Sequence, residues 1–248
     1  MMAYDNTETT ETRVTRLNEA LRGADAQEVL RVAFQEEWPH EIAYVSSFGA
    51  ESVAMLALIA EVEPAAPVIF LDTGMHFPQT LEYKATLTEI LGLTGVQEHE
   101  PDENERLKED PKNTLWKSDP DACCDLRKVR PLEPALEGFS AWITGRKRFH
   151  GGARMQLPVF EASGERVKVN PMASWTQEDV KAFLDARDLP PHPLVSQGYP
   201  SIGCWPCTKP AEDPNDVRSG RWAGRDKSEC GLHVEKSDRP RIFWGDNI

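Results

Sequence analysis

Five cysteines are the residues of this 248-residue chain whose types and spacing point most clearly to chemistry. Cys123 and Cys124 are adjacent, Cys204 and Cys207 form a CxxC pair, and Cys230 stands alone. Four thiolates can hold zinc or an iron–sulfur cluster. Neighbouring side chains tend to diverge, so an adjacent pair suits a cluster, whose ligand positions are spread out, better than one small ion. Zinc and buried free thiols are the alternatives.

Cys230 differs from the other four because basic residues surround it. Arg225, Lys227 and His233 are close in sequence and would favour the thiolate, which is the nucleophilic form of cysteine. Gly231 allows a mobile turn beside it. The odd number of cysteines and the absence of a secretory signal argue for a reducing cytosol and against a disulfide framework. The basic neighbours make Cys230 a candidate nucleophile, and a C-terminal thiol of no chemical role is an equal alternative.

Alternating strand and helix patterns must position these residues. The predicted strands are short apolar segments at 42–45, 68–71, 141–144 and 167–169. The predicted helices are a pair over 13–34 that breaks near Gly23, then 53–60, 78–91 and 176–187. This order predicts an α/β fold with a mostly parallel central sheet flanked by helices. We expect a flexible tail over 1–12, one α/β domain over 13–210 and an irregular C-terminal segment over 211–248.

Three loops, 46–52, 71–74 and 144–154, follow predicted strands, at the sheet edge where α/β proteins bind ligands. Segment 46–52 is small and hydroxyl-bearing, and it precedes a helix, so it offers N–H groups to an anion. It resembles the PP-loop pattern Ser-Gly-Gly-x-Asp-Ser of adenine-nucleotide enzymes but departs at Phe48 and Glu51. Phe48 would crowd a triphosphate, so we expect nucleotide binding without ATP cleavage. An ordinary strand-to-helix turn is the alternative, and an Asp-Thr-Gly turn is favoured for 71–74.

Charge is distributed unevenly. The net charge is −13, which argues against nucleic acid and anionic lipid as partners. The longest apolar run, 53–60, is too short to span a membrane. Seven acidic residues lie within 98–110, which we interpret as a solvated face or loop, whereas seven basic residues lie within 124–154. The basic segment predicts a pocket for a small anion, with scattered surface charge as the alternative.

Four motifs together make a specific resemblance. They are Cys-Cys-Asp-Leu-Arg-Lys at 123–128, Tyr-Pro-Ser-Ile-Gly-Cys-Trp-Pro-Cys at 199–207, Arg-Ser-Gly-Arg-Trp at 218–222 and Glu-Cys-Gly-Leu-His at 229–233. The chain resembles the assimilatory sulfonucleotide reductases, in the adenylylsulfate (APS) reductase branch that carries a [4Fe–4S] cluster. The resemblance runs from about 46 to 233 and implies a Rossmann-like adenine-nucleotide α-hydrolase (PP-loop) fold.

The resemblance implies roles for the cysteines. One [4Fe–4S] cluster per chain would be held by Cys123, Cys124, Cys204 and Cys207. Cys230 would attack the sulfur of adenylyl sulfate, expel AMP and become an S-sulfocysteine, from which a thioredoxin dithiol would release sulfite. The enzyme would act in the cytoplasm, in sulfate assimilation and cysteine biosynthesis. Family members are often homo-oligomers, and the sequence leaves the oligomeric state and any lid open.

The resemblance also implies a substrate site. Lys128 would lie between cluster and substrate and act in catalysis. The residues implied in substrate binding are Ser46, Ser47, Phe48, Gly49, Glu51, Ser52, Leu71, Asp72, Gly145, Arg154, Arg218 and Arg221. Arg148 and His233 are further candidates, whereas the roles of Arg146 and Lys147 are left open and His150 is expected to be a packed imidazole.

Three other functions compete with this one. A reductase of the 3′-phosphorylated substrate (PAPS), or of both substrates, needs only one more basic contact near the ribose. A PP-loop ATP pyrophosphatase needs the Gly-Gly loop that Phe48 interrupts. A zinc-stapled nucleic-acid module is opposed by the net charge of −13.

Overall fold

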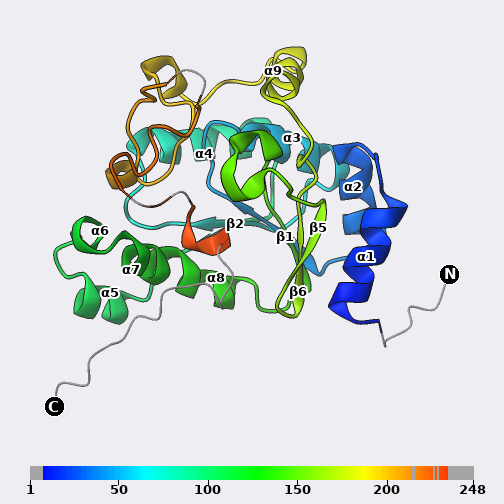
Figure 1. Cartoon of the computed structure of the whole chain (residues 1–248), viewed down its shortest axis with the longest axis horizontal. Helices are drawn as coiled ribbons and strands as arrows, with labels where there is room; N and C mark the ends of the chain where they lie inside the picture. The colour runs from blue at the N-terminus through cyan, green and yellow to red at the C-terminus, as the bar shows by residue number, and fades with distance from the viewer. Residues whose placement is uncertain (1–7, 214–215, 226, 228, 234–248) are drawn as a thin grey trace.

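A computed structural model describes residues 8–213, 216–225, 227 and 229–233 (Figure 1). Its centre is a six-stranded sheet with the strand order β3-β2-β1-β4-β6-β5. The strands are β1 (Ile42–Ser46), β2 (Val68–Leu71), β3 (Val96–His99), β4 (Ala141–Ile143), β5 (Phe160–Ser163) and β6 (Arg166–Val169). All neighbouring pairs are parallel except β5 with β6. The predicted α/β class with a mostly parallel sheet is confirmed.

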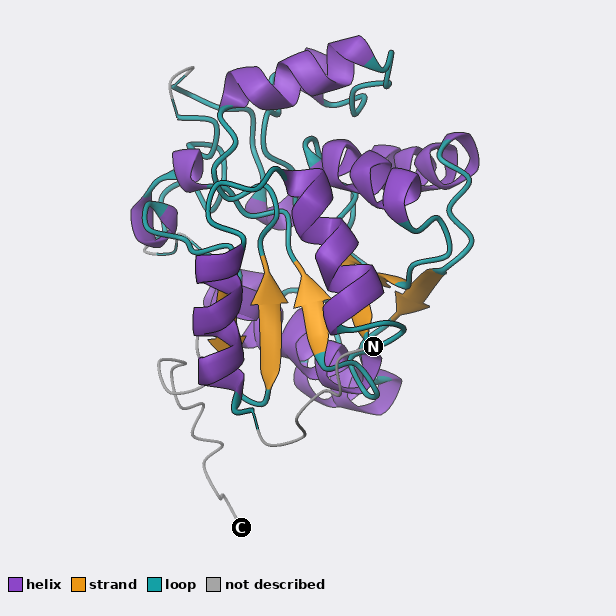
Figure 2. Ribbon diagram, turned by 90° about the vertical axis from the view of Figure 1, so that its right-hand side faces the viewer, coloured by secondary structure: helices purple, strands orange, loops and turns teal. Residues whose placement is uncertain are grey.

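Helices cover both faces of this sheet (Figure 2). The helices are α1 (Thr10–Ala20), α2 (Ala26–Val32), α3 (Ser52–Val62), α4 (Pro78–Ile90), α5 (Glu103–Glu109), α6 (Leu115–Ser118), α7 (Pro120–Cys124), α8 (Arg130–Ala135) and α9 (Gln177–Ala186). Several begin at the side-chain caps expected for their sequences. Asp119 caps α7, and Thr176 forms a capping box with Asp179 at the start of α9.

The sequence predicted some of these elements, α9 among them, and missed others, namely β3, β5 and the helices α5–α8. The four predicted strands correspond to β1, β2, β4 and β6, and the helices predicted before 91 correspond to α1–α4. Strand β3 is polar and partly exposed at the sheet edge, so it carries no apolar signal. The predicted tail is corrected at its end, because α1 begins at Thr10; residues 1–7 lie outside the described part. Residues 234–248 of the predicted C-terminal segment also lie outside it.

Alternate residues of the strands form two cores. On one face, Ile42 and Tyr44 of β1 pack with Phe70 of β2 beneath α1–α4 and α9. On the other face, Ala43 of β1 and Trp142 of β4 pack against α8. This alternation follows from the two-residue period of a strand. In Figure 1, α3 and α4 lie on the opposite side of the sheet from α8.

Strand order places a crevice at the carboxyl ends of β1 and β4. From β1 the chain continues outward to β2 and β3, whereas β4 lies on the other side of β1 and continues to β6. The loops that leave β1 and β4 therefore diverge, which opens a ligand crevice in folds of this class.

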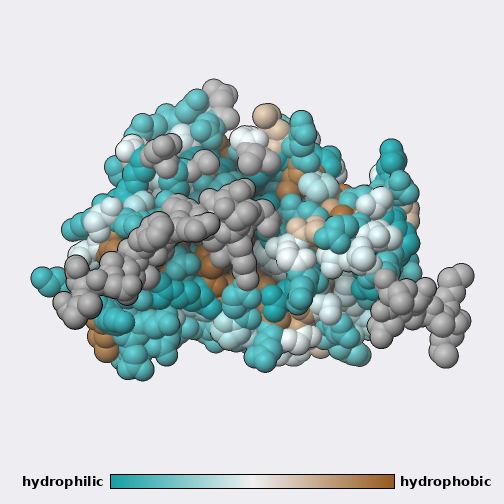
Figure 3. Space-filling view, turned by 60° about the horizontal axis from the view of Figure 1, so that its bottom comes forward, coloured by the Kyte–Doolittle hydropathy of each residue, from teal (hydrophilic) through white to brown (hydrophobic). Residues whose placement is uncertain are grey.

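Hydrophilic residues cover most of the face in Figure 3. Among the described helices, none has the length and apolar character needed to cross a membrane.

Candidate active site

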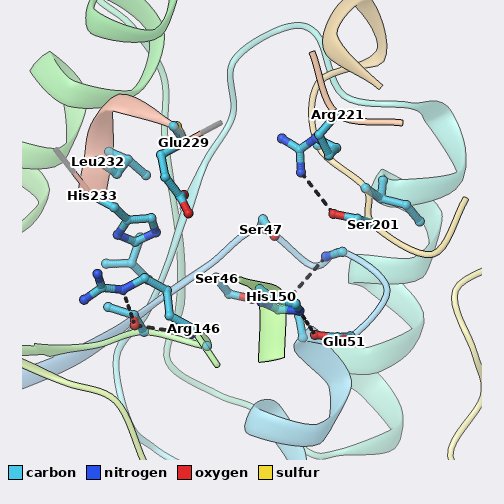
Figure 4. Close-up of a pocket in the computed structure, with 18 of the residues that line it drawn as sticks. Ser46, Ser47, Glu51, Arg146, His150, Ser201, Arg221, Glu229, Leu232 and His233 are labelled. Carbon is cyan, nitrogen blue, oxygen red and sulfur yellow. Dashed lines mark hydrogen bonds and ion pairs between the residues drawn. The ribbon is translucent and has the colours of Figure 1, made fainter. Parts of the chain in front are cut away.

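A cavity of about 200 Å³ occupies the crevice at the carboxyl ends of β1 and β4 (Figure 4). We call it the large cavity. Segments that are far apart in sequence form its wall. Besides Lys128, the lining residues lie within 44–52, 71–76, 142–154, 200–203 and 218–233. All three loops that the sequence placed after strands therefore contribute to one site.

The loop after β1 is shaped by its own hydrogen bonds. The Ser46 hydroxyl accepts from the Phe48 N–H at 3.2 Å, and the Ser52 hydroxyl accepts from the Gly49 N–H at 3.0 Å. A Cβ at Gly49 would lie only 3.0 Å from the carbonyl oxygen of Ile202, so glycine lets segment 200–203 approach closely. The loop after β1 therefore packs closely against segment 200–203, which forms another part of the cavity wall.

Glu51 contacts two basic side chains at the cavity wall. Its Oε2 lies 2.8 Å from Lys147 Nζ and 3.0 Å from His150 Nε2 (Figure 4). Burial alone would raise the pKa of Glu51, but the Lys147 charge and the contacts with His150 lower it to about 2. The carboxylate is ionised at neutral pH, so this group of side chains is held together by charge.

A second carboxylate, Glu229, lies between two arginines. Arg154 donates two hydrogen bonds to it, from Nε to Oε1 at 2.5 Å and from Nη2 to Oε2 at 2.6 Å. Arg218 Nη2 lies 3.7 Å from Glu229 Oε2. Arg154 Nη1 also contacts His150 Nδ1 at 3.0 Å, which links this group to the Glu51 group.

His233 lies flat against Trp142 in the cavity wall, with ring centroids 6.1 Å apart and planes 8° apart. Burial and the nearby charges of Arg146 and Arg154 lower its pKa well below the usual value, so the ring is neutral. Its Nδ1 is buried without a hydrogen-bond partner. Arg146 itself forms an ion pair with Glu161 of β5.

A smaller cavity lies beside the large one, and four of the five cysteines line it. We call it the cysteine cavity; its cysteines are Cys123, Cys124, Cys204 and Cys207. All five cysteines of the chain, each within the described part, are free thiols. In that part, no three Cys, His, Asp or Glu side chains converge as ligands of a single metal ion. Four thiols around one cavity are a donor set for a larger centre such as an iron–sulfur cluster.

The turn after β2 connects the two halves of the cysteine set. Arg127, from the helical segment of Cys123 and Cys124, donates to the Thr73 carbonyl at 2.7 Å. The Thr73 hydroxyl lies 3.3 Å from Cys204 Sγ. Arg127 is buried and also forms an ion pair with Asp110 at 2.8 Å. Asp110 is therefore a buried exception in the acidic segment that we predicted to be solvated.

Three residues line both cavities: Lys128, Arg221 and Trp222. Lys128 follows α7 in a π-helical turn (Asp125–Val129), which turns its side chain to this position. Although burial opposes ionisation, the sulfurs of Cys204 and Cys230 raise the pKa of Lys128, so it is a cation. A Cβ at Gly203 would collide with the Arg221 guanidinium, so any larger residue there would have to displace this side chain.

Cys230 lines the large cavity beside this shared wall. A hydrogen bond from the Cys124 thiol, together with the charges of Lys128 and Arg221, lowers the pKa of Cys230 well below the usual value although burial opposes this. The same hydrogen bond raises the pKa of Cys124. The arrangement can present a thiolate to a bound ligand.

Apart from the four cysteines of the cysteine cavity, three of the predicted site residues do not line the large cavity. Phe48 is fully buried in the core and packs edge-on against Phe70. The prediction that its side chain would crowd a triphosphate is therefore wrong. Asp72 instead accepts a hydrogen bond from the Gly74 N–H at 2.8 Å, as in an ordinary Asx turn. Arg148 is exposed and donates to the Leu157 carbonyl at 2.8 Å.

The other predicted site residues do lie at the cavity, with additions that the sequence did not reveal. The predicted residues found there are Cys230, Lys128, Ser46, Ser47, Gly49, Glu51, Ser52, Leu71, Gly145, Arg154, Arg218, Arg221 and His233. His150, expected to be a packed imidazole, is a cavity residue. Lys147 and Glu229 were not predicted, because their partners lie 96 and 75 residues away in sequence. The one signal for Glu229 was its position next to Cys230.

Comparisons with known proteins agree with this geometry. Residues 41–210 match the family model described as the phosphoadenosine phosphosulfate reductase domain. The adenosine 5′-phosphosulfate reductase of Mesorhizobium japonicum is 49% identical over 207 residues, which cover 84% of this chain and 82% of that protein. A crystal structure of phosphoadenylyl-sulfate reductase from Candida auris aligns with a TM-score of 0.69 and 29% identity, covering 84% of this chain and 99% of that one.

The fold extends to other adenine-nucleotide proteins. The FMN adenylyltransferase of Candida glabrata aligns with a TM-score of 0.55 at 13% identity, over 92% of this chain and 79% of that one. At this identity the likeness concerns the fold alone. It agrees with the adenine-nucleotide α-hydrolase fold that the sequence motifs implied.

Proposed function

This chain belongs to the phosphoadenosine phosphosulfate reductase family, and on that premise we propose that it reduces adenosine 5′-phosphosulfate to sulfite and AMP. We further propose that Cys230 is the nucleophile. The observation that carries the proposal is the position of Cys230, which lines the large cavity together with the PP-loop-like segment and contacts Cys124 of the cysteine cavity. A nucleophile, anion-binding groups and a tetracysteine set thus meet at one sheet edge.

The reaction follows from the chemistry of a thiolate. Cys230 Sγ attacks the sulfur of the sulfate group, the bond between that sulfur and the phosphate oxygen breaks, and AMP leaves with the bonding electrons. Cys230 becomes an S-sulfocysteine. A dithiol then attacks Cys230 Sγ, expels sulfite and is itself oxidised to a disulfide, so the dithiol supplies both electrons.

The cations of the site stabilise the charge that moves during the first step. Negative charge develops on the departing phosphate, so fixed positive groups lower the barrier when they face that oxygen. We assign this role to Lys128 and Arg221, which line the large cavity together with Cys230. Arg154 and Arg218 bind an anionic group of the substrate. The loop 46–52 holds the ribose and phosphate side, and the backbone at Leu71 and Gly145 contacts adenine.

The four cysteines of the cysteine cavity are proposed to hold one [4Fe–4S] cluster. Their positions around one cavity, walled by Arg127, Lys128 and Arg221, support this. When bound, the cluster supplies a charged group next to the nucleotide. Lys128, which lines both cavities, would then place its charge next to both ligands.

We propose thioredoxin as the source of the dithiol and a reducing, cytoplasmic compartment for the reaction. Five free thiols and a nucleophilic cysteine are consistent with such an environment. The product sulfite would enter sulfate assimilation and cysteine biosynthesis.

Intact-mass measurement tests the proposal. The protein is incubated anaerobically with adenosine 5′-phosphosulfate and without thiol. We expect the mass to increase by one SO₃ group, to return to the starting value on addition of thioredoxin, and to stay constant in Cys230→Ser. No increase in the wild type, with the cluster intact, would refute this function for this substrate.

The 3′-phosphorylated substrate is the second candidate. The family model and the Candida auris structure carry the name of that activity, which favours testing it. The same mass experiment with the 3′-phosphorylated nucleotide decides between the two, because only the accepted substrate transfers its SO₃ group.

A further inference from the structure

An acidic side chain lies where an anionic group of the substrate would bind. The Glu229 carboxylate points into the large cavity (Figure 4) and accepts two hydrogen bonds from Arg154, at 2.5 and 2.6 Å. Arg218 Nη2 lies 3.7 Å from the same carboxylate. Two parallel hydrogen bonds from one guanidinium are also the geometry by which arginine binds sulfate and phosphate. The carboxylate therefore uses the bonding positions that such an anion needs.

This ion pair differs from an ordinary surface pair. The Arg154 side chain is only 9% exposed and that of Glu229 only 18%, so solvent screens the contact weakly. Although burial opposes ionisation, the hydrogen bonds and charge of Arg154 and the charges of Arg218 and Arg146 lower the pKa of Glu229, so it is a carboxylate at neutral pH. One internal anion thus faces three arginines.

We propose that Glu229 and the sulfate group of the substrate compete for Arg154 and Arg218, so that the sulfate must displace the carboxylate before reaction. This inference rests on the proposed reductase function and adds a specificity determinant to it. The alternative is a permanent structural ion pair between Glu229 and Arg154, in which the carboxylate keeps its partners while substrate is bound.

Competition of this kind selects against small anions. Inorganic sulfate or phosphate would have to displace a carboxylate that the chain itself holds nearby, with no other contact to compensate. A nucleotide has adenosine contacts that offset this cost. Glu229 directly precedes Cys230, so displacement of the Glu229 carboxylate also alters the conformation of the chain next to the nucleophile. This alteration occurs only when the complete substrate is bound.

Binding measurements in a Cys230→Ser background test the proposal without chemistry. Adenosine 5′-phosphosulfate and AMP are titrated calorimetrically into Cys230→Ser and into Cys230→Ser with Glu229→Gln. Glutamine keeps the size of the side chain but removes its charge. We expect adenosine 5′-phosphosulfate to bind about tenfold more tightly to the Glu229→Gln protein, because a charge-assisted hydrogen bond no longer has to be broken. The affinity for AMP, which lacks the sulfate group, should change by less than about twofold.

Glu37→Gln is the matched control. Glu37 is a mostly buried carboxylate that forms an ion pair with Arg16, and neither residue lines the large cavity, so its removal changes the net charge equally without freeing an arginine of the site. We expect it to change affinity for adenosine 5′-phosphosulfate by less than about twofold. An equal gain in this control would refute competition and indicate a general effect of charge.

Other outcomes are equally decisive. Unchanged or weaker binding of adenosine 5′-phosphosulfate to a folded Glu229→Gln protein would overturn the proposal in favour of the permanent structural ion pair. An equal gain for AMP would also overturn it, because the arginines would then bind the 5′-phosphate. If Glu229→Gln does not fold, Glu229→Asp serves instead, since a shorter carboxylate reaches Arg154 less well and should also tighten binding. Failure of Cys230→Ser to bind the nucleotide would refute the proposed function instead.

Discussion

The large cavity and the cysteine cavity share a wall, but their polar groups are stabilised differently. In the large cavity, Lys147 is paired with Glu51 and Arg154 with Glu229, so the protein itself neutralises these two cations. In the cysteine cavity, burial raises the pKa of Cys123 to about 11, which leaves a neutral thiol. The folded chain alone completes the first cavity. In the second cavity, a positively charged ligand such as the proposed cluster would favour thiolates.

The shared wall explains how two such sites can act together. Lys128, Arg221 and Trp222 line both cavities, so a charge in either acts on the same side chains. The effects of substitutions in the two cavities should therefore be distinguishable when iron content and turnover are measured separately. A substitution at the shared wall should lower turnover without loss of the cluster or the nucleotide.

The largest expected effect comes from the nucleophile. Cys230→Ser should abolish sulfite release, because a serine hydroxyl is not ionised at neutral pH and cannot form the S-sulfocysteine. Its iron content and visible absorbance should match the wild type, because Cys230 lies in the large cavity. Loss of colour in this variant would show that the roles of the two cavities had been confused.

Cys204→Ser is the converse change in the cysteine cavity. We expect loss of both cluster and sulfite release, measured as iron, acid-labile sulfide and turnover, because a tetracysteine site loses one of its four ligands. Cys230→Ser is the matched control for replacement of one sulfur. A colourless but active Cys204→Ser protein would contradict a required cluster.

Lys128→Ala tests the shared wall. We expect kcat to fall about 10²-fold, as when one group that stabilises transition-state charge is removed, with little change in AMP affinity or iron content. Lys112→Ala, which removes an exposed lysine, is the control. Unchanged turnover in Lys128→Ala would remove this residue from the mechanism.

Phe48→Leu tests whether Phe48 belongs to the core and not to the large cavity. Because Phe48 is fully buried against Phe70, the smaller side chain should lower the free energy of unfolding by about 1–3 kcal/mol. AMP affinity should change by less than about twofold. A clear change in affinity at unchanged stability would restore the earlier expectation that Phe48 limits the ligand.

The last effect, which does not concern the reaction, comes from a histidine outside both cavities. Burial lowers the pKa of His192 from 6.5 to about 4, and its Nδ1 accepts from the Leu194 N–H at 3.1 Å. Between these pH values the unfolded chain binds more protons, so the free energy of unfolding should fall as pH drops from about 6.5 to 4, by up to about 3 kcal/mol. His192→Gln should flatten this dependence in chemical unfolding. An equally steep dependence in the variant would assign it to other groups.

How much the sequence predicted depended on whether the signal was local. Strands β1 and β2 were found because runs of buried apolar residues have a clear composition, whereas β3 was missed because Gln97 and Glu98 are polar and exposed. The acidic segment was interpreted as solvated, yet Asp110 is buried against Arg127. That pairing depends on two loops meeting in space, which no local pattern records.

The same limit applied within the site. Phe48 was interpreted from its place in a PP-loop-like motif, but its backbone has a φ of 47° and its side chain enters the core. Among three consecutive basic residues, Arg146 and Lys147 line the large cavity while Arg148 faces solvent. The direction of each side chain was set by the path of the backbone after β4, and composition does not contain it.

The sequence by itself determined the chemistry that is available: four cysteines in two pairs, a fifth among basic residues, and parallel strands that end in small polar loops. The tertiary structure decided which of these groups meet. Glu51 reaches Lys147 across 96 residues and Glu229 reaches Arg154 across 75, so these pairs exist only once the sheet has formed. The physical reason is that a buried charge needs a partner at contact distance, and only the folded backbone sets that distance.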